Sequence, residues 1–400
     1  MARPLFLVTG PLFWLMKKYD YIIAGGGMAG LSLAYYITQS PELRDRRILI
    51  IDREQKNRND RTWCFWERGE GICEPILFRT WDRVEFHGTT LSGLLDMGNY
   101  HYKMLRGIDF YEFVYARLAQ FPNIEIRQAT VNRIKDTDQG GFVIADDEPL
   151  LADYVFDSTF ALTLDKPANH NLLQHFKGWI IHAEKPCFDV TRPRMMDFRV
   201  AQHNDCRFLY VLPFDTNTAL VEFTLFNQKL LTEAEYETDL RQYIDNHLDT
   251  GTYRISETEF GVIPMSDVPT KENPSKHIIR IGTSGGFTKA STGYTFQRTQ
   301  RYLREVVQSL AQTGKPHRRQ SWFRGRFKFY DSILLNVLEN HRYPADDMFT
   351  LLYEHNTPEA VFRFLDEDTT FGEELRVMWS MPKVPFTLAL LDVLRRKLIS

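Results

Sequence analysis

Residues 19–54, YDYIIAGGGMAGLSLAYYITQSPELRDRRILIIDRE, decide the fold. A short apolar strand ends at Ala24 and runs into three glycines, and a helix is expected from about Ala29 until Pro41 stops it. A second β-branched run, Ile48–Ile51, ends at Asp52. Strand, helix and strand within about 35 residues form a βαβ unit, and strands joined in this way predict a parallel α/β sheet.

The glycines between the first strand and the helix match G-x-G-x-x-G at Gly25, Gly27 and Gly30. The first glycine permits a tight turn, the second lets the backbone approach a pyrophosphate, and the third lets the helix pack closely on the strand. The helix N-terminus offers N–H groups to a diphosphate. Asp52 is placed to accept hydrogen bonds from an adenosine ribose, and an acidic residue there disfavours a 2′-phosphate.

We therefore predict a site for FAD or NAD rather than NADP, and a glycine-rich turn that only packs is the alternative. The residues assigned to this cofactor site are Gly25, Gly26, Gly27, Met28, Ala29, Gly30 and Asp52.

The composition narrows the functional classes. The 400 residues are long enough for two domains. A net charge of −3 does not indicate the strongly basic surface that binds polyanions, so no nucleic acid partner is expected. Aromatic residues make up 14% of the chain, which fits either a long apolar cavity or a core rich in phenylalanine.

The cysteines and the N-terminal segment give expectations about the cellular compartment of the protein. Cys64, Cys73, Cys187 and Cys206 form no C-x-x-C pair and have no histidine at ligand spacing, so we expect free thiols in a reducing cytosol and no metal site. No apolar run is long enough to span a bilayer. Residues 1–15 resemble a weak signal peptide without a cleavage site. We interpret residues 1–16 as a disordered tail or a start placed too far upstream, and a tail that touches the membrane is the alternative.

The predicted secondary structure changes along the rest of the chain. A helix capped by Asp109 and Glu112 is expected to run to Leu118, and three β-rich runs between 124 and 159 predict a meander that returns to the first sheet. Residues 165–275 predict a mostly antiparallel layer with a helix at Glu233–Leu248, and the last part of the chain is helical. A second glycine-rich run, TSGGFTKASTGYTF at 283–296, follows an apolar strand. Flavoproteins have such a loop where the chain returns to FAD, usually with Gly-Asp where this chain has Gly282-Thr283.

Four stretches together resemble the bacterial lycopene β-cyclases: DRTWCFW (60–66), FLYVLPFDTNTALVEFTLF (208–226), GTSGGFTKASTGYTF (282–296) and EDTTFGEELRVMWSMPKVPF (367–386). The resemblance covers nearly all of the chain from Met16 onward, although Ala290 stands where the family usually has proline. It implies an FAD-binding Rossmann-like α/β fold of the flavoprotein hydroxylase/reductase type, with an inserted antiparallel β-sheet substrate domain and a helical C-terminal region. The implied segments are a tail at 1–16, an FAD-binding domain at 17–75, 105–164 and 276–320, a substrate domain at 76–104 and 165–275, and the helical region at 321–400.

The resemblance also implies an activity and a location. The acyclic ends of lycopene are converted into β-rings, giving β-carotene via γ-carotene, by an isomerisation that needs reduced FAD and takes electrons from NAD(P)H. The protein is expected on the cytoplasmic side of the membrane as a peripheral protein, with other carotenoid enzymes as further partners. Ring closure needs an acid for the terminal alkene, a negative group near the cation, and a pocket that excludes water.

Glu222 lies between Val221 and Phe223 in an apolar strand, where a carboxylate is costly unless it is paired or protonated. We assign it as the catalytic acid or base, or as the carboxylate that stabilises the cation, and a surface glutamate of an alternating strand is the alternative. By the resemblance, further cofactor contacts are Arg61, Thr62, Gly282, Gly285, Gly286, Thr292, Gly293 and Tyr294. The substrate pocket is expected to include Trp63, Phe65, Trp66, Phe223 and Phe287, and ordinary core packing is the alternative for Trp63 and Phe65. Lys289 either neutralises flavin charge or is a solvated loop residue.

The C-terminal run puts Leu388, Leu391, Val393 and Leu394 beside Arg395, Arg396 and Lys397. This pattern fits a helix on a membrane surface or an amphipathic core helix that ends in cations.

Two other functions compete with the cyclase interpretation. One is another flavin enzyme, such as a prenyl-chain reductase or a hydroxylase, and the other is a flavin- and carotenoid-binding protein without turnover.

Overall fold

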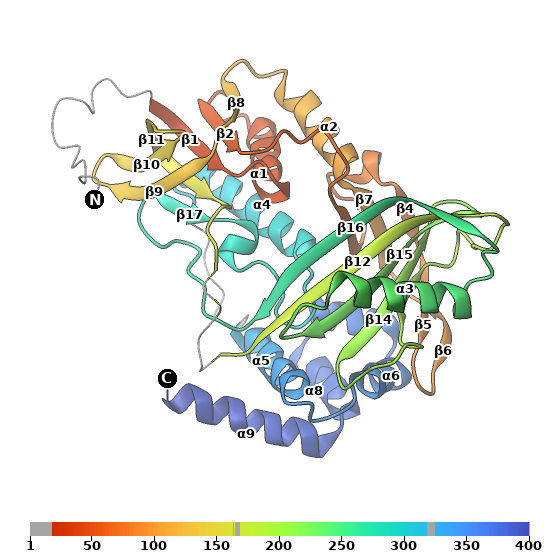
Figure 1. Cartoon of the computed structure of the whole chain (residues 1–400). Coiled ribbons are helices and arrows are strands. Elements are labelled where there is room, and N and C mark those ends of the chain that lie inside the picture. The colour runs from red at the N-terminus through yellow and green to blue at the C-terminus, as the bar shows by residue number, and fades with distance from the viewer. Residues whose placement is uncertain (1–17, 163, 165–168, 318–324, 400) are drawn as a thin grey trace, which may run out of the picture.

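The computed structural model describes residues 18–162, 164, 169–317 and 325–399. Figure 1 shows a first sheet with its helices at one end of the molecule, a long twisted second sheet beside it, and C-terminal helices below the second sheet. The interpretation of residues 1–16 lies outside the described residues.

The first sheet carries the glycine turn. Its strand order is β8-β2-β1-β11-β10-β9, and β17 pairs with β11. The parallel strands are β1 (Lys18–Ala24), β2 (Ile48–Asp52), β8 (Ile124–Gln128), β11 (Glu148–Asp157) and β17 (Ile278–Arg280). β9 (Val131–Thr137) and β10 (Gly140–Ala145) form an antiparallel meander with β11. The predicted βαβ unit and the predicted meander are both confirmed.

Helices α1 (Met28–Gln39), α2 (Gly107–Leu118) and α4 (Phe296–Thr313) share an apolar core with one face of this sheet. The predicted capping box of α2 is wrong. The helix begins at Gly107, with Arg106 as its N-cap, and the Asp109 carboxylate accepts from the Arg106 guanidinium at 2.7 Å. Asp109 lies within the first turn of the helix that it was expected to cap, and its carboxylate is engaged with this arginine.

The second sheet has the order β16-β12-β15-β14-β13-β5-β6 and is antiparallel except between β13 and β5. Its strands are β5 (Arg83–His87), β6 (Ser92–Asp96), β12 (Asn171–Ala183), β13 (Arg194–Asp197), β14 (Cys206–Pro213), β15 (Thr218–Asn227) and β16 (Tyr253–Ser266). α3 (Glu233–His247) covers one face and starts with a Thr232–Glu235 capping box, so the helix predicted at Glu233–Leu248 is confirmed.

The other face of the second sheet packs against the small sheet and the C-terminal helices. The small sheet consists of β3 (Thr62–Glu67), β4 (Arg79–Trp81) and β7 (His101–Arg106). The helices are α5 (Gly325–Glu339), α6 (Ala345–His355), α7 (Pro358–Leu365), α8 (Phe371–Ser380) and α9 (Lys383–Ile399). The predicted fold, an α/β domain with an inserted antiparallel sheet and a helical C-terminal region, is confirmed.

We expect Gly30→Ala to destabilise the fold and Gly27→Ala to leave it nearly unchanged. A Cβ at Gly30 would lie 2.0 Å from the Gly25 carbonyl oxygen, whereas a Cβ at Gly27 would meet no atom within 4 Å. Overpacking of this kind costs about 1–3 kcal/mol. Urea unfolding of the two cofactor-free variants measures the difference, and equal midpoints would contradict this account of the helix–strand contact.

Candidate functional site

The glycine turn lies where β1 ends and α1 begins. Gly25 has a φ of 100°, and a Cβ there would lie 2.1 Å from the Ser158 Oγ. Gly27 borders a cavity and has open space beside it. The N–H groups in the first turn of α1 have no acceptor within the helix. The turn therefore leaves room for a diphosphate at a helix N-terminus.

Asp52 holds this turn from the end of β2. Its Oδ2 accepts from the Gly26 N–H at 2.7 Å, and its Oδ1 accepts from the Glu54 N–H at 2.8 Å. The Lys56 Nζ lies 3.7 Å from the Asp52 Oδ1. The carboxylate is thus fixed in place beside the glycines, and ribose binding stays a prediction.

A cavity of about 380 Å³ extends from the glycine turn to the second sheet. Its lining includes Gly27, Met28, Ala29, Arg61, Thr62, Trp63, Gly282, Thr292, Gly293 and Tyr294, all assigned from the sequence. The late loop closes on the turn, because a Cβ at Gly282 would lie 2.9 Å from the Ala29 Cβ. Gly285 and Gly286 instead border a neighbouring hollow on the other side of this loop.

Glu222 shares this cavity with a second carboxyl group, Glu259, which the sequence analysis did not find. β12 runs between β15 and β16, and its Gly178 is opposite Glu222 on one side and Glu259 on the other. A Cβ at Gly178 would lie 2.9 Å from the Glu259 Cγ. The glycine therefore leaves room for the Glu259 side chain above β12, on the side toward Glu222, and the two carboxyls interact electrostatically.

The pair is held in a state that favours protonation. Burial raises the pKa of Glu222 well above its usual range, and the charge and hydrogen bond of Glu259 raise it further. The Thr224 Oγ1 donates to the Glu222 Oε1 at 3.1 Å and acts in the opposite direction. Burial also raises the pKa of Glu259. Two neighbouring carboxylates repel each other, so the raised pKa values favour a pair that retains a proton near neutral pH.

Three tyrosine hydroxyls lie next to the carboxyl pair. The Tyr294 Oη is 3.4 Å from the Tyr102 Oη and 3.5 Å from the Tyr210 Oη. Burial raises the pKa of Tyr294 to about 12 and raises the pKa values of Tyr102 and Tyr210 well above their usual range. Burial, together with the charge of Glu222, raises the pKa of the Cys64 thiol. These groups stay neutral and surround the carboxyls with polar but uncharged atoms.

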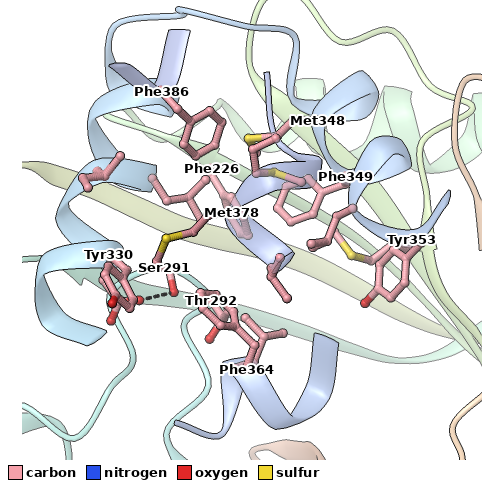
Figure 2. A pocket seen from close by; sticks show the side chains of 18 of the residues that line it. Phe226, Ser291, Thr292, Tyr330, Met348, Phe349, Tyr353, Phe364, Met378 and Phe386 are labelled. Carbon is pink, nitrogen blue, oxygen red and sulfur yellow. Dashed lines mark hydrogen bonds between the residues drawn. The ribbon is translucent and has the colours of Figure 1, made fainter. Parts of the chain in front are cut away.

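A second cavity, of about 320 Å³, lies between the second sheet and the C-terminal helices. Figure 2 shows Met348, Phe349 and Tyr353 of α6 and Met378 and Phe386 of α8 and α9 around this space. Its lining is almost wholly apolar and aromatic. The two cavities share Tyr210, Thr292 and Tyr294 in their walls, so the apolar space ends beside the carboxyl pair.

The structure separates the aromatic residues that were assigned to the substrate pocket. Trp63 lines the first cavity and Trp66 the second. Phe65 stacks on Phe296 in the core of the first domain, with centroids 4.3 Å apart, and Phe287 stacks on Tyr302 at 4.0 Å. Phe223 packs beneath α3, on the face of β15 opposite Glu222. The assignments of Phe65, Phe223 and Phe287 are corrected to core packing.

Lys289 takes neither of the roles considered for it. Its ammonium is buried and donates to the Asp331 carboxylate at 2.9 and 3.1 Å, and Glu367 lies at 3.4 Å. The Ser291 hydroxyl donates to the same carboxylate at 2.6 Å. This ion pair ties the late glycine loop to α5.

The residues around the first cavity fit a dinucleotide. Gly27 leaves the required space at a helix N-terminus, and the loop at Gly282 faces it across the same cavity. Arg61 and Lys56 are the cationic side chains of the lining, and they suit an anionic diphosphate. The turn, the parallel sheet and the antiparallel sheet above the cavity define the architecture of a flavoprotein.

Solved structures share this architecture. A geranylgeranyl bacteriochlorophyll reductase-like protein from Thermoplasma acidophilum superposes with a TM-score of 0.67 at 14% identity, covering 94% of this chain and 100% of that protein. A flavoprotein/dehydrogenase from Cytophaga hutchinsonii gives 0.62 at 11% identity, covering 95% and 100%. At these identities the likeness establishes the fold.

Sequence comparisons identify the family of flavoproteins to which the chain belongs. The model of the lycopene cyclase protein family matches residues 20–391, and the chain belongs to this family. It is 23% identical over 390 residues to the lycopene beta-cyclase of Pseudescherichia vulneris, covering 92% of this chain and 95% of that protein. It is 25% identical over 321 residues to the chloroplastic lycopene beta cyclase of Arabidopsis thaliana, covering 72% of this chain and 60% of the plant protein.

We expect Glu222→Gln to change how stability depends on pH. Because the folded-state pKa of Glu222 is raised, its stabilising contribution is complete below the usual glutamate pKa of 4.5 and is lost as pH rises through the folded value. The variant should therefore gain stability over the wild type between about pH 5 and 8, by up to about 1.4 kcal/mol per pH unit. Urea unfolding at both pH values measures this, and parallel pH curves would contradict a protonated pair.

Proposed function

We propose that the protein is a lycopene β-cyclase, which closes the acyclic ends of lycopene into β-rings without net electron transfer. The observation that carries the proposal is the Glu222–Glu259 pair, which lies in the wall of the cavity at the glycine turn and next to a second, apolar cavity. Membership of the lycopene cyclase family supports it, as do the names of the bacterial and plant relatives.

The two cavities suit a long polyene. The apolar cavity would receive the conjugated chain, since its aromatic and thioether side chains offer polarisable contact and most of its wall is apolar. The chain end would then reach the shared wall at Tyr210 and Tyr294, beside the carboxyl pair. Exclusion of water from this enclosure protects a carbocation from hydroxylation.

The carboxyl pair would carry the proton chemistry. In this proposal Glu222 donates a proton to the terminal alkene, and the neighbouring double bond closes the ring. The pair is then left with additional negative charge that faces the ring cation across a short distance. A ring proton returns to the pair as the ring double bond forms, so the product is an isomer of the substrate.

The cofactor proposed for the first cavity is FAD in its reduced form, with NAD(P)H as the source of electrons. Gly27 and the first turn of α1 would hold its diphosphate, Asp52 its ribose, and Arg61, Thr62 and the loop from Thr292 to Tyr294 its ring system. Reduced flavin supplies negative charge near the reacting end of the substrate when it is bound.

A substrate of this kind dissolves in lipid, so we propose that the protein works on the cytoplasmic side of a membrane as a peripheral protein, beside other carotenoid enzymes. None of the described helices is both long enough and apolar enough to cross a membrane.

We expect Glu222→Gln and Glu259→Gln each to lower cyclisation by about 100-fold, because each removes a group that holds or moves the proton. Glu257→Gln is the matched control, since Glu257 is exposed on the same strand as Glu259. Pigment analysis after co-expression with lycopene biosynthesis measures the conversion, and mass spectrometry separates cyclisation from reduction or hydroxylation. Wild-type conversion by Glu222→Gln, or a product heavier than lycopene, would contradict the proposal.

We expect Gly27→Val to lose bound FAD without losing the fold, because the valine side chain would occupy the space proposed for the diphosphate. Asp52→Ala should weaken FAD binding by about 1.5–3 kcal/mol, the value of a charge-assisted hydrogen bond. Flavin absorbance of the purified proteins and circular dichroism measure both effects. Full flavin occupancy in a folded Gly27→Val variant would place the cofactor elsewhere.

A further inference from the structure

Helices α8 and α9 turn large apolar side chains toward solvent. The exposed residues are Phe371, Leu375 and Trp379 on α8 and Val384, Leu388, Leu391, Leu394 and Leu398 on α9. Trp379 is 79% exposed and Leu398 is 87% exposed. On α9 the spacing of three and four residues forms one outward stripe, while Ala389 and Val393 are buried on the inner side. Val393, which the sequence grouped with the surface leucines, belongs to that inner side.

The inward side of α9 already has its core contact, so the outer stripe is a separate surface. The Asp392 Oδ2 accepts from the Asn336 amide of α5 at 2.8 Å, and the Arg396 Nε lies 3.3 Å from the same oxygen. Figure 1 shows α9 along the outer edge of the molecule, beyond α5 and α8. The reading of α9 as an ordinary core helix therefore accounts for only one of its two faces.

The charges around this stripe are basic. Arg376, Lys383, Arg395 and Lys397 are exposed on the two helices. The acidic side chains of these helices are engaged with arginines, in the pairs Glu373–Arg363, Glu374–Arg326 and Asp392–Arg396. None of these four exposed cations pairs with a carboxylate among the described residues, although Lys383 lies over the Trp379 ring and Lys397 over the Phe329 ring. An apolar stripe with exposed cations beside it complements the acyl chains and anionic headgroups of a lipid surface.

The apolar cavity opens at this same surface. Lys383 and Thr387, both exposed on the first turns of α9, line the cavity together with Met378, Met381 and Phe386. Figure 2 shows Met378 and Phe386 on neighbouring helices at the cavity wall. A guest that leaves the cavity at Lys383 and Thr387 therefore emerges among the exposed side chains of α8 and α9.

We propose that the outer face of α8 and α9 docks on an anionic lipid bilayer, and that an apolar chain-like guest enters the second cavity from the lipid between Lys383 and Thr387. The docking stands on the surface alone, and only the identity of the guest as a polyene rests on the proposed function. Lipid is the occupant that matches both the exposed cations of α8 and α9 and a cavity mouth that receives a water-insoluble guest.

Vesicle binding of the full chain tests the docking without any turnover. Leu388→Ser with Leu391→Ser should lower partition into phosphatidylcholine–phosphatidylglycerol vesicles by about tenfold or more, because both side chains leave the lipid. Leu230→Ser is the matched control, since Leu230 is an exposed leucine on the loop before α3 and should leave binding unchanged. Binding should fall when phosphatidylglycerol is omitted or salt is raised.

Tryptophan quenching by brominated lipid locates the contact. Wild-type protein should be quenched, and Trp379→Phe should remove most of that quenching while keeping vesicle binding. Unchanged partition of the leucine variant, or quenching that survives Trp379→Phe, would overturn the docking face. If the leucine changes instead dissociate a dimer in sedimentation and leave vesicle binding intact, a second copy covers this face and the proposal is wrong.

The entrance is tested by Thr387→Trp, which narrows the mouth without removing an apolar group from the stripe. This variant should bind vesicles normally, yet convert vesicle-borne lycopene at least about tenfold more slowly than wild type. Equal rates would overturn the entrance. If the wild type converts no lycopene under any condition, the proposed function fails, and the vesicle-binding and quenching results still decide the docking.

Discussion

Two carboxyl groups that meet over a glycine impose the main constraint on this structure. Glu222 and Glu259 come from strands on either side of β12, and a side chain at position 178 would crowd Glu259 where it lies between them. Their contact is tolerable because the pair keeps a proton, and it keeps the proton because the surroundings are enclosed and hold neutral hydroxyls. The second sheet, the small sheet and the late glycine loop all contribute walls to that enclosure.

A buried ion pair fixes the position of the late glycine loop, which forms part of the cavity wall. Lys289 and Asp331 are both buried, and their ion pair joins the loop that carries Tyr294 to α5. Removing one partner would leave a buried charge, which costs about 3–5 kcal/mol. The loop forms part of both cavities, so its position sets the relation between the dinucleotide turn, the carboxyl pair and the apolar space.

Local patterns were sufficient for the first domain, and the apolar neighbours of Glu222 together with the family resemblance drew attention to that carboxyl. The glycine turn, Asp52 and the βαβ unit follow from spacing that is contiguous in the chain. Glu259 was missed because its place beside Glu222 depends on how β15 and β16 are each aligned with β12. The two glutamates are 37 residues apart in the chain, so no local pattern connects them. The alternation of β15 could have excluded Phe223 from the site, since neighbours in a strand face opposite sides. The burial of Lys289 depends on Asp331, 42 residues away, and has no local signal.

In the proposed reaction a carboxyl pair that holds a proton drives a redox-neutral ring closure. The most direct measurement is an anaerobic assay in deuterated water, with enzyme whose flavin has been reduced by dithionite and lycopene supplied in liposomes. The account predicts many turnovers for each reduced flavin, flavin absorbance that stays in the reduced state, and a cyclic product that carries solvent deuterium on its new rings. Flavin oxidation in proportion to product, or rings without deuterium, would contradict it.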